Sequence, residues 1–567
     1  MVRKRKVLKA MIVAVSATML MVSSVGASGH HSYKKFKNSI DFKNYKNVIV
    51  LIPDGCDETV QTVARWYKGE DLQVDKMAGG GVKVHMANSV IPGSAAAATA
   101  FATGHKTTVR FLGVGPRTDD LLTGFEPTAE PYAPVASILE AAKLAGKATG
   151  IVATSRVTHA TPAAFACHIE DRGWDNDIME HMVYNNIDVV FGGGARHLIP
   201  SGETYTTSFG DIWGGKRTDG ENLMDVLTGR GYQFVDSKEE MEMLSEGPVW
   251  GLFDDSHMQP DIDRQYFADH EPSIAEMTAK AIELLSQDRD GFFLMVEGSQ
   301  VDWAGHNNDP IYMTTDFLAF DDAVKVACDF ADEKGRTLVM AFPDHNTGGM
   351  KIGHYYTAMG YTETTIEDLV SPLKGMKTSA NGLAAMLEDN TDAELMAKVS
   401  EHWNLTITQA DVDEIRELEP SVGLSYALAR VLSKNYTVIG WTTHGHNGET
   451  VPFWTHGANG VKTGIIDNTD LATMAAEAMD VDLDRATMNL YVDLDNVTDA
   501  YTIEDDGLGN LTLTVAGAEL PISKDFMKIE KKNGKEKIVQ LPGLTVYAPA
   551  TGKVYVAKKA LRLLGIN

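Results

Sequence analysis

The chain contains 567 residues, and its 78 acidic side chains against 51 basic ones give a formal net charge of −27. That length exceeds one ordinary domain, while a hydrophobic content of 44% is normal for a soluble globular protein. The negative charge argues against nucleic acid as a partner, and it would repel an anionic substrate unless cations reversed the local field. Metal ions are therefore expected to matter to this protein.

The first 27 residues predict a secretory signal peptide. Residues 3–6 are all basic, an apolar stretch runs from about residue 10 to residue 22, and small residues lead up to Ala27. We expect cleavage near Ala27 and a secreted protein, either extracellular or in the cell envelope. No later run is apolar enough to span a bilayer, so no transmembrane anchor is expected. The three cysteines are too few for a disulfide framework and are expected to be buried thiols: Cys56, Cys167 and Cys328.

Strands and helices alternate through residues 28–486. Short apolar runs lead into polar loops at residues 47–58, 148–164, 188–197, 291–309 and 336–349. Helical patterns separate these runs, for example at residues 133–146 and 273–287. The alternation predicts an α/β fold with a large, mostly parallel central sheet and helices on both faces. Ligands of such folds bind beyond the carboxyl ends of the strands, so the polar loops are expected to converge there.

Two other segments follow different patterns. Residues 365–438 are helical and polar, and we interpret them as an inserted crown with a structural or gating role. Residues 487–567 alternate with period two between turn residues, which predicts a small antiparallel β-rich module. From residue 521 onward, 10 Lys and Arg against 3 Asp and Glu give a net charge of +7. We expect this basic module to contact the acidic body or an anionic cell envelope, with a plain solvated face as the alternative.

A serine stands at the start of an alanine-rich stretch, VIPGSAAAATAFATGHKT, at residues 90–107. The alanines favour a helix and Gly93 allows a tight entry, so Ser94 is expected at the helix N-terminus. Free backbone N–H groups and the positive end of the helix dipole meet there, which suits an anion. An ordinary N-cap serine is the alternative, and the surrounding residues must decide between the two.

Carboxylates and imidazoles collect on the predicted strand ends. Together with the hydroxyl of Thr161 they are Asp54, His159, Glu297, Asp302, His306, Asp344, His345 and His446. One such residue alone would be an ordinary loop residue, but five segments that deliver these groups to one edge have the composition of a multi-metal site. Asp302 and His306 have the i, i+4 spacing that places both on one helical face. Asp344 and His345 are adjacent on a predicted turn.

These blocks resemble those of the alkaline phosphatases, a family of metal-dependent phosphate-monoester hydrolases. The serine, Asp-His, Glu…Asp-x-x-x-His and final His-x-Gly blocks occur in the family's order over roughly residues 47–483. The resemblance implies that residues 28–486 form a catalytic domain of this kind. For the last block we prefer His446 to the nearby His444, because only His446 opens the His-x-Gly-Glu pattern.

The resemblance implies three groups of metal ligands and a set of phosphate-binding residues. The ligands of a first zinc would be Asp302, His306 and His446. The ligands of a second zinc would be Asp54, Asp344 and His345, with Ser94 as the nucleophile beside them. The ligands of a third, magnesium-type site would be Asp54, Thr161 and Glu297. The phosphate would contact Ser94, Arg172, His159 and Trp303.

The implied reaction is the hydrolysis of phosphate monoesters through a phosphoserine at Ser94. Two zinc ions about 4 Å apart can neutralise the attacking and leaving oxygens of an in-line displacement. Arg172 suits a bidentate grip on the non-bridging oxygens, which a lysine could not reproduce. The implied partners are small phosphate monoesters, and members of the family are often homodimers.

Three positions depart from the family pattern. Gly93 replaces an aspartate that helps to restrain the arginine, so we expect a looser Arg172, weaker phosphate retention and faster product release. His159 stands where some members have aspartate, and Trp303 stands where some have lysine or histidine. Both changes lie around the third metal and the phosphate, so Zn²⁺ or Co²⁺ is the alternative to Mg²⁺ there.

Three other functions stay open from the sequence alone. A phosphodiesterase or phosphonate-monoester hydrolase of the same superfamily would share the metal residues, although Ser94 with Arg172 favours a monoesterase. A non-catalytic metal-binding envelope protein would use the C-terminal module for attachment. A mutase acting on phosphosugars shares the fold, but the signal peptide argues against its cytosolic substrates.

Overall fold

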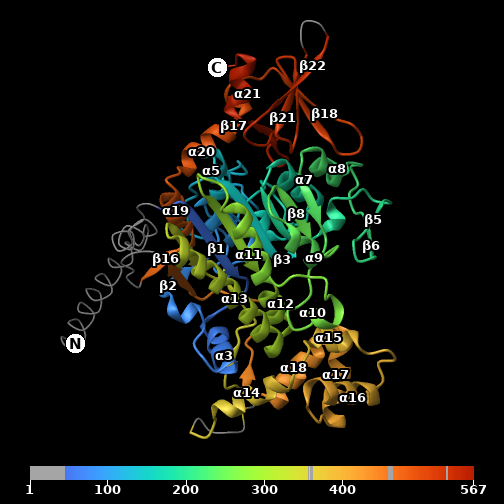
Figure 1. Cartoon of the computed structure of the whole chain (residues 1–567). Coiled ribbons are helices and arrows are strands. Elements are labelled where there is room, and N and C mark those ends of the chain that lie inside the picture. The colour runs from blue at the N-terminus through green and yellow to red at the C-terminus, as the bar shows by residue number, and fades with distance from the viewer. Residues whose placement is uncertain (1–44, 356, 358–361, 458–463, 531–533, 567) are drawn as a thin grey trace, which may run out of the picture.

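Three parts follow one another along the long direction of the molecule in a computed structural model (Figure 1). A sheet with its helices forms the middle, a group of helices lies at the bottom of the view, and a β-rich module lies at the top. The structure describes residues 45–355, 357, 362–457, 464–530 and 534–566. The predicted signal peptide lies outside these residues. Among the helices described, none combines the length and the apolar character needed to cross a membrane.

A ten-stranded sheet forms the body. Its strands lie in the order β16, β2, β15, β10, β1, β9, β3, β4, β8, β7. In that order their bounds are Ile465–Asp467, Ala78–Lys83, Val451–His456, Thr337–Ala341, Asn47–Pro53, Phe292–Gly298, Ala148–Arg156, Val189–Gly193, Val249–Leu252 and Gln233–Val235. All pairs from β10 to β7 are parallel, whereas β15 is antiparallel to both of its neighbours. The prediction of a mostly parallel sheet is confirmed.

Strand β1 shows how the sheet is buried on both faces. All of its residues are buried, and its side chains alternate between two hydrophobic clusters. Such a continuous apolar run is typical of a parallel strand covered by helices on both sides. One face is covered by α4 (Ser94–Thr103), α5 (Ile138–Leu144), α7 (Asp175–Tyr184) and α19 (Asn468–Met479). The other is covered by α3 (Glu58–Lys68), α11 (Ile274–Leu285) and α13 (Pro310–Lys334).

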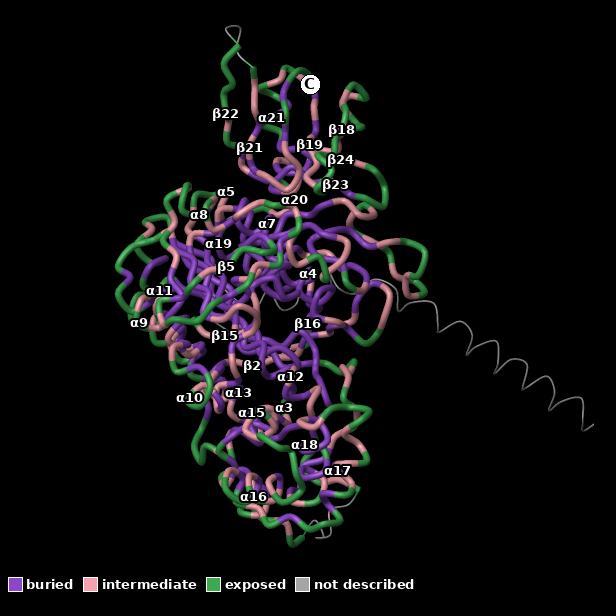
Figure 2. Tube along the Cα trace, turned by 90° about the vertical axis from the view of Figure 1, so that its right-hand side faces the viewer, coloured by how far each residue is buried: buried purple, intermediate pink, exposed green. Residues whose placement is uncertain are grey.

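Buried residues concentrate in this middle part (Figure 2). The three cysteines are also buried and unpaired, as predicted: Cys56, Cys167 and Cys328. Since they lie unpaired within the hydrophobic clusters, they behave as small apolar side chains.

The inserted crown consists of helices, and a short β-ladder at its two ends forms a neck next to the body. Its helices are α14 (Ile366–Gly375), α15 (Ala380–Ala385), α16 (Asp392–Trp403), α17 (Gln409–Val422) and α18 (Leu424–Tyr436). At the neck, β12 (Lys351–Ile352) pairs antiparallel with β13 (Ile439–Gly440). Helix α18 packs on α12 (Gln300–Asn307), and α14 packs on α3. The crown therefore lies at the carboxyl ends of the central strands.

The C-terminal module has a hydrophobic core of its own. Its larger antiparallel sheet contains β18 (Tyr501–Asp505), β19 (Leu511–Val515), β20 (Ala518–Pro521), β21 (Phe526–Glu530) and β22 (Glu536–Gln540). Its smaller sheet contains β17 (Val492–Asp493), β24 (Lys553–Val556) and β23 (Val546–Ala548). Helix α20 (Leu483–Leu490) leads into the module and α21 (Lys558–Leu564) ends it. Arg230 of the body lies 2.8 Å from Asp525 of the module, which fixes one contact between them.

Candidate metal centre

The polar side chains expected at the strand ends lie together at the carboxyl edge of the sheet. Three groups have potential ligand atoms within 4.8 Å of one another: Asp302, His306 and His446; Asp54, Asp344 and His345; Asp54, His159 and Glu297. Thr161, on the short helix α6 (Ala160–Ala163), donates a hydrogen bond to Asp54 Oδ2 at 3.3 Å. The fold thus gathers all nine residues that the sequence suggested as metal ligands or neighbours of them.

Helix α12 presents two members of the first group. Asp302 and His306 lie one turn apart on it, with Asp302 Oδ2 3.4 Å from His306 Nε2. The third member, His446, comes from β14 (His446–Asn447), which pairs antiparallel with β11 (Asn346–Thr347). The i, i+4 spacing and this short ladder together place one carboxylate and two imidazoles around one point.

Backbone carbonyls determine which ring nitrogen carries a proton in His306 and His446. Nδ1 of His306 lies 2.6 Å from the carbonyl of His444, and Nδ1 of His446 lies 2.8 Å from the carbonyl of Pro92. Because a carbonyl only accepts, each Nδ1 carries a proton, and the two Nε2 atoms face each other at 3.2 Å. Burial opposes a charge on His306, but the Asp302 carboxylate outweighs it and raises the pKa of His306 to about 9. A positive charge is therefore favoured at the point where a cation would bind.

The second group is completely buried. His345 Nε2 lies 3.1 Å from Asp344 Oδ2 and 3.6 Å from Asp54 Oδ1. Neither carboxylate oxygen has a hydrogen-bond partner among the described residues. Burial, together with repulsion from Asp344 and Asp302, raises the pKa of Asp54 well above its usual range. Buried carboxylate oxygens without hydrogen-bond partners destabilise a protein unless a cation lies between them. The two aspartate oxygens and His345 Nε2 therefore form a set of donor atoms that fits a metal ion.

Ser94 lies against this second group. It is the first residue of α4, and the preceding Gly93 provides no side chain to cap the helix. Ser94 Oγ is 3.2 Å from His345 Nε2. The hydroxyl of Thr347 donates to Asp302 at 2.6 Å, so it accepts from His345 Nδ1 at 3.2 Å. His345 Nε2 therefore presents a lone pair toward Ser94 and the two aspartates.

The third group contains further buried polar atoms without partners. Glu297 Oε2 accepts from Ser155 at 3.4 Å, but Glu297 Oε1 has no partner among the described residues. Burial raises the pKa of Glu297 to about 7. His159 Nδ1 is likewise buried and unpaired. The orphaned Glu297 oxygen, with Asp54 and the Thr161 hydroxyl nearby, fits a third cation, whereas His159 Nδ1 carries a proton because Nε2 of the same ring accepts from Arg172.

Arg172 lies beside these groups and is held by a histidine. Its Nη2 donates to His159 Nε2 at 2.7 Å. In the part of the chain that is described, no carboxylate forms an ion pair with this guanidinium. The ring of Trp303 meets the ring of His159 edge to face, with centroids 5.5 Å apart. Trp303 is therefore placed to support His159.

Two residues absent from the sequence-based predictions complete this corner. His257 lies with its ring centroid 4.4 Å from that of Trp303, and the backbone N–H of Arg156 donates to His257 Nδ1 at 3.1 Å. His257 follows β8 through a polar loop. That is the same strand-to-loop pattern that identified the other residues, so His257 could have been found from the sequence.

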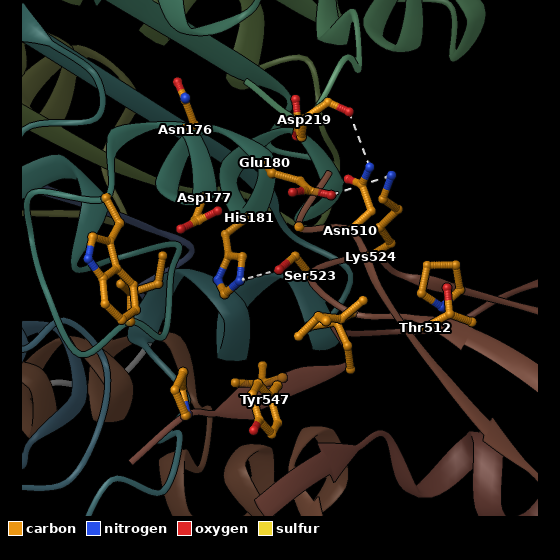
Figure 3. Close-up of a pocket in the computed structure, with 18 of the residues that line it drawn as sticks. Asn176, Asp177, Glu180, His181, Asp219, Asn510, Thr512, Ser523, Lys524 and Tyr547 are labelled. Atoms are coloured by element: carbon orange, nitrogen blue, oxygen red, sulfur yellow. Dashed lines mark hydrogen bonds and ion pairs between the residues drawn. The ribbon is translucent and has the colours of Figure 1, made fainter. Parts of the chain in front are cut away.

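A cavity of about 770 Å³ lies apart from this centre, between the body and the C-terminal module (Figure 3). Three acidic residues on its wall, Glu180, Asp219 and Glu221, also have oxygens close enough to hold a metal ion. However, Lys524 lies 2.8 Å from Glu221 and 3.4 Å from Glu180, and Arg217 pairs with Asp219. Because two basic side chains pair with these three carboxylates, we interpret them as an ion-pair network rather than a metal centre.

Comparisons with known proteins agree on one family. The family model described as alkaline phosphatase matches residues 45–481. Alkaline phosphatase 3 of Bacillus subtilis is 33% identical over 491 residues, which cover 83% of this chain and 97% of that protein. The human tissue-nonspecific isozyme is 31% identical over 379 residues, covering 61% of this chain and 67% of that protein.

Solved structures give the same result. The alkaline phosphatase of Thermus thermophilus has a TM-score of 0.67 at 25% identity, covering 80% of this chain and 95% of that chain. The cold-active enzyme of Shewanella sp. has a TM-score of 0.63 at 26% identity, covering 76% of this chain and 99% of that chain. With a family match over most of its length and relatives that are phosphatases, this chain is a hydrolase that belongs to the alkaline phosphatase family.

Proposed function

We propose that this protein hydrolyses phosphate monoesters through a phosphoserine formed at Ser94. The observation that carries the proposal is the position of Ser94 Oγ, 3.2 Å from His345 Nε2 at the N-terminus of a buried helix. Backbone amides there favour an anion, whereas the surrounding carboxylates repel one unless cations neutralise them. A phosphoryl group and metal ions would therefore have to bind together.

The three groups of ligands would hold two zinc ions and a third, magnesium-type ion. The first zinc would take Asp302, His306 and His446. The second would take Asp54, Asp344 and His345. The third ion would take Asp54, Thr161 and Glu297. Bound ions of this kind neutralise charge on the attacking and leaving oxygens and lower the pKa of a nearby hydroxyl. Imidazole ligands suit zinc and oxygen ligands suit magnesium, while His159 beside the third group makes Zn²⁺ or Co²⁺ the alternative there.

In the first half of the reaction Ser94 attacks the phosphorus in line with the leaving alcohol. A bond forms between Oγ and phosphorus, the bond to the alcohol oxygen breaks, and the alcohol leaves with a proton. In the second half, water attacks the phosphoserine, inorganic phosphate is released and the Ser94 hydroxyl is restored. One water is consumed for each ester cleaved.

Arg172 would hold the phosphate during both halves. One N–H of its guanidinium is donated to His159 at 2.7 Å, which leaves the others for non-bridging phosphate oxygens. His159 and Trp303 lie at the side of that site, where they would limit how far the guanidinium can move. Their contribution to phosphate binding would then act through Arg172.

We further propose that the protein is secreted after cleavage near Ala27 and acts on small phosphate monoesters as a homodimer. The ion pairs of Lys524 and Asp525 support a C-terminal module that docks on its own catalytic body rather than on the cell envelope. The mass of the mature protein in solution tests the dimer.

Hydrolysis of an aryl phosphate at alkaline pH, with zinc and magnesium supplied, tests the proposed reaction. We expect Ser94→Ala to lose more than about 10³-fold in turnover, as enzymes do when a covalent nucleophile is removed. The wild type should also lose its activity in a chelator. Ser89→Ala, a variant just upstream of the helix, should remain active and serves as the matched control.

Two outcomes would replace this proposal. If neither the wild type nor Ser94→Ala hydrolyses the monoester but either cleaves a diester, the protein is a phosphodiesterase of the same superfamily. If metal binds but neither ester is cleaved, the protein is a non-catalytic metal-binding protein.

A further inference from the structure

Three aromatic rings from distant parts of the chain meet beside Arg172. The rings of His159, His257 and Trp303 contact one another edge to face, with centroids 5.8 Å apart for the two histidines, 4.4 Å for His257 and Trp303, and 5.5 Å for His159 and Trp303. Arg172 donates to Nε2 of His159 at 2.7 Å. The position of this guanidinium therefore depends on how firmly the ring of His159 is held.

His257 is itself anchored by Arg156. The backbone N–H of Arg156 donates to His257 Nδ1 at 3.1 Å, and the Arg156 side chain lies alongside the ring. Arg156 Nε donates in turn to Asp175 at 2.7 Å. Since Asp175 begins α7 three residues after Arg172, the contacts form a closed loop that starts and ends at the phosphate-binding arginine.

Two glycines at the end of β4 allow His257 to approach. A Cβ on Gly193 would lie 2.2 Å from the carbonyl oxygen of Ser256, and one on Gly194 would lie 2.9 Å from the side chain of Arg156. Gly194 also has a φ of 102°, which side chains rarely tolerate. The absence of side chains at these two glycines thus leaves room for Arg156 and for the loop that carries His257.

The ring of His257 stays neutral between its neighbours. Burial and the nearby Arg156 and Arg196 lower the pKa of His257 to about 3. His257 therefore adds no positive charge of its own to this group of rings.

We propose that His257 is a positioning residue for phosphate binding: it fixes His159 and Trp303, and through His159 it holds Arg172 in this chain, where Gly93 provides no carboxylate to do so. This inference rests on the proposed function. His257 acts through other residues and does not itself touch the substrate.

Phosphate affinity of the zinc- and magnesium-loaded protein tests the inference, measured both by calorimetry and as the inhibition constant against an aryl phosphate. We expect His257→Ala to weaken phosphate binding on the order of five- to tenfold and to raise KM in parallel, without a proportional fall in kcat. His257→Leu, which fills most of the lost volume without an aromatic edge, should change in the same direction. His257→Phe restores a ring against Trp303 and should recover most of the affinity.

A matched control and a double variant separate positioning from general loosening. His270 also sits in the body, stacked on Phe209 at 3.8 Å, but it has no contact with His159 or Trp303 among the described residues. We expect His270→Ala to leave phosphate affinity unchanged even if its thermal midpoint falls as far as that of His257→Ala. In a His159→Ala background, His257→Ala should cause no further loss, since the two act through the same contact.

Equal phosphate affinity in the wild type, His257→Ala and His257→Leu would overturn the inference and leave the proposed function standing. So would an equal loss in His270→Ala, or fully additive losses in the double variant. A wild type that binds no phosphate with its metals loaded would overturn the proposed function and this inference with it.

Discussion

The backbone does not require a glycine at Gly93, the residue before the proposed nucleophile Ser94. Its φ of −121° and ψ of 152° are extended, and a Cβ there would meet nothing within 4 Å. Gly93 is also the N-cap of α4, a position where aspartate or asparagine would serve at least as well. A side chain at this position is therefore compatible with the fold, and its absence leaves Arg172 with His159 as its side-chain partner.

Gly93→Asp should tighten the hold on phosphate at the expense of turnover. A carboxylate next to Ser94 would restrain Arg172 by a charge-assisted hydrogen bond, so phosphate would be retained longer. We expect both kcat and the inhibition constant for phosphate to fall roughly three- to tenfold, equivalent to about 0.7–1.4 kcal/mol. Gly93→Asn, which caps the helix without a charge, is the control. Unchanged constants in Gly93→Asp would show that Arg172 is already as restrained as an aspartate could make it.

Some residues of the site could be predicted because local spacing decides where they lie. Ser94 is set by the start of its own helix, and Asp302 and His306 share a helical face by their i, i+4 spacing. The contact of His257 with Trp303 could not be predicted in this way. It joins the loop after β8 to the helix after β9, and those loops meet only because of the order of the strands in the sheet.

At the scale of elements, one buried aspartate joins the crown to α13, the helix that follows the candidate metal ligands Asp302 and His306. Asp309 caps α13 by accepting from Ile311 and Tyr312 at 3.2 Å through one oxygen. Its other oxygen accepts from the backbone of Ala380 at 2.7 Å, at the start of α15 in the crown. Burial raises the pKa of Asp309 to about 6. The two oxygens of this carboxylate therefore fix α13 and α15 relative to each other.

Asp309→Asn should destabilise the protein even though the side chain keeps its size. An amide has one acceptor oxygen, so its NH₂ group would face either the N–H groups of α13 or the N–H of Ala380. We expect a loss of about 1–3 kcal/mol in the free energy of unfolding, the cost of leaving a buried donor unpaired. Urea unfolding measures it at pH 8. Thr391→Ala, which removes the exposed N-cap of α16, should cost only about 0.5–1 kcal/mol. Equal losses in the two variants would contradict the double role of Asp309.

Whole strands also differ in whether the sequence predicts them. The central strands could be predicted because continuous apolar runs mark them, as in β1. Strand β2 could not, since only Val82 of its glycine-rich sequence is buried. The two-residue ladder of β11 with β14, which delivers His446, is too short to leave a periodic pattern. Its position follows from tertiary contacts alone.

At the scale of the whole molecule, charged residues join the C-terminal module to the body. Glu180 of α7 lies 3.4 Å from Lys524 of the module and 3.7 Å from Arg217. Burial raises the pKa of Glu180 to about 7, despite the attraction of Lys524 and with the repulsion of Glu221 added. The folded protein therefore favours the protonated form of this carboxyl more strongly than the unfolded chain does, in which its ordinary pKa is 4.5.

This shift predicts how the pH alters the stability of a Glu180→Gln variant. Because the folded pKa is raised, the stability linked to Glu180 is complete below about pH 4.5 and is lost as the pH rises through about 7. The amide of glutamine does not titrate. The free energy of unfolding of the variant should therefore increase relative to that of the wild type between pH 5 and pH 8.5. The gain is on the order of 3 kcal/mol at most, at about 1.4 kcal/mol for each pKa unit.

Thermal unfolding of both proteins at the two pH values measures this gain. Glu239→Gln, at an exposed site in α9 (Lys238–Met243), is the control and should keep a constant difference from the wild type. A constant difference for Glu180→Gln as well would mean that its ion pairs fully offset its burial.

The neck of the crown has a consequence for how such a protein can change during evolution. Lys351 pairs with Gly440 and Ile352 with Ile439, so a short ladder joins the two ends of the insertion to each other. Helices can then change between these ends while the central strands keep their register, provided that the packing of α18 on α12 and the contact of Asp309 with Ala380 are kept. Selection can thus alter the helices that cover the candidate metal centre while the residues of that centre are inherited unchanged.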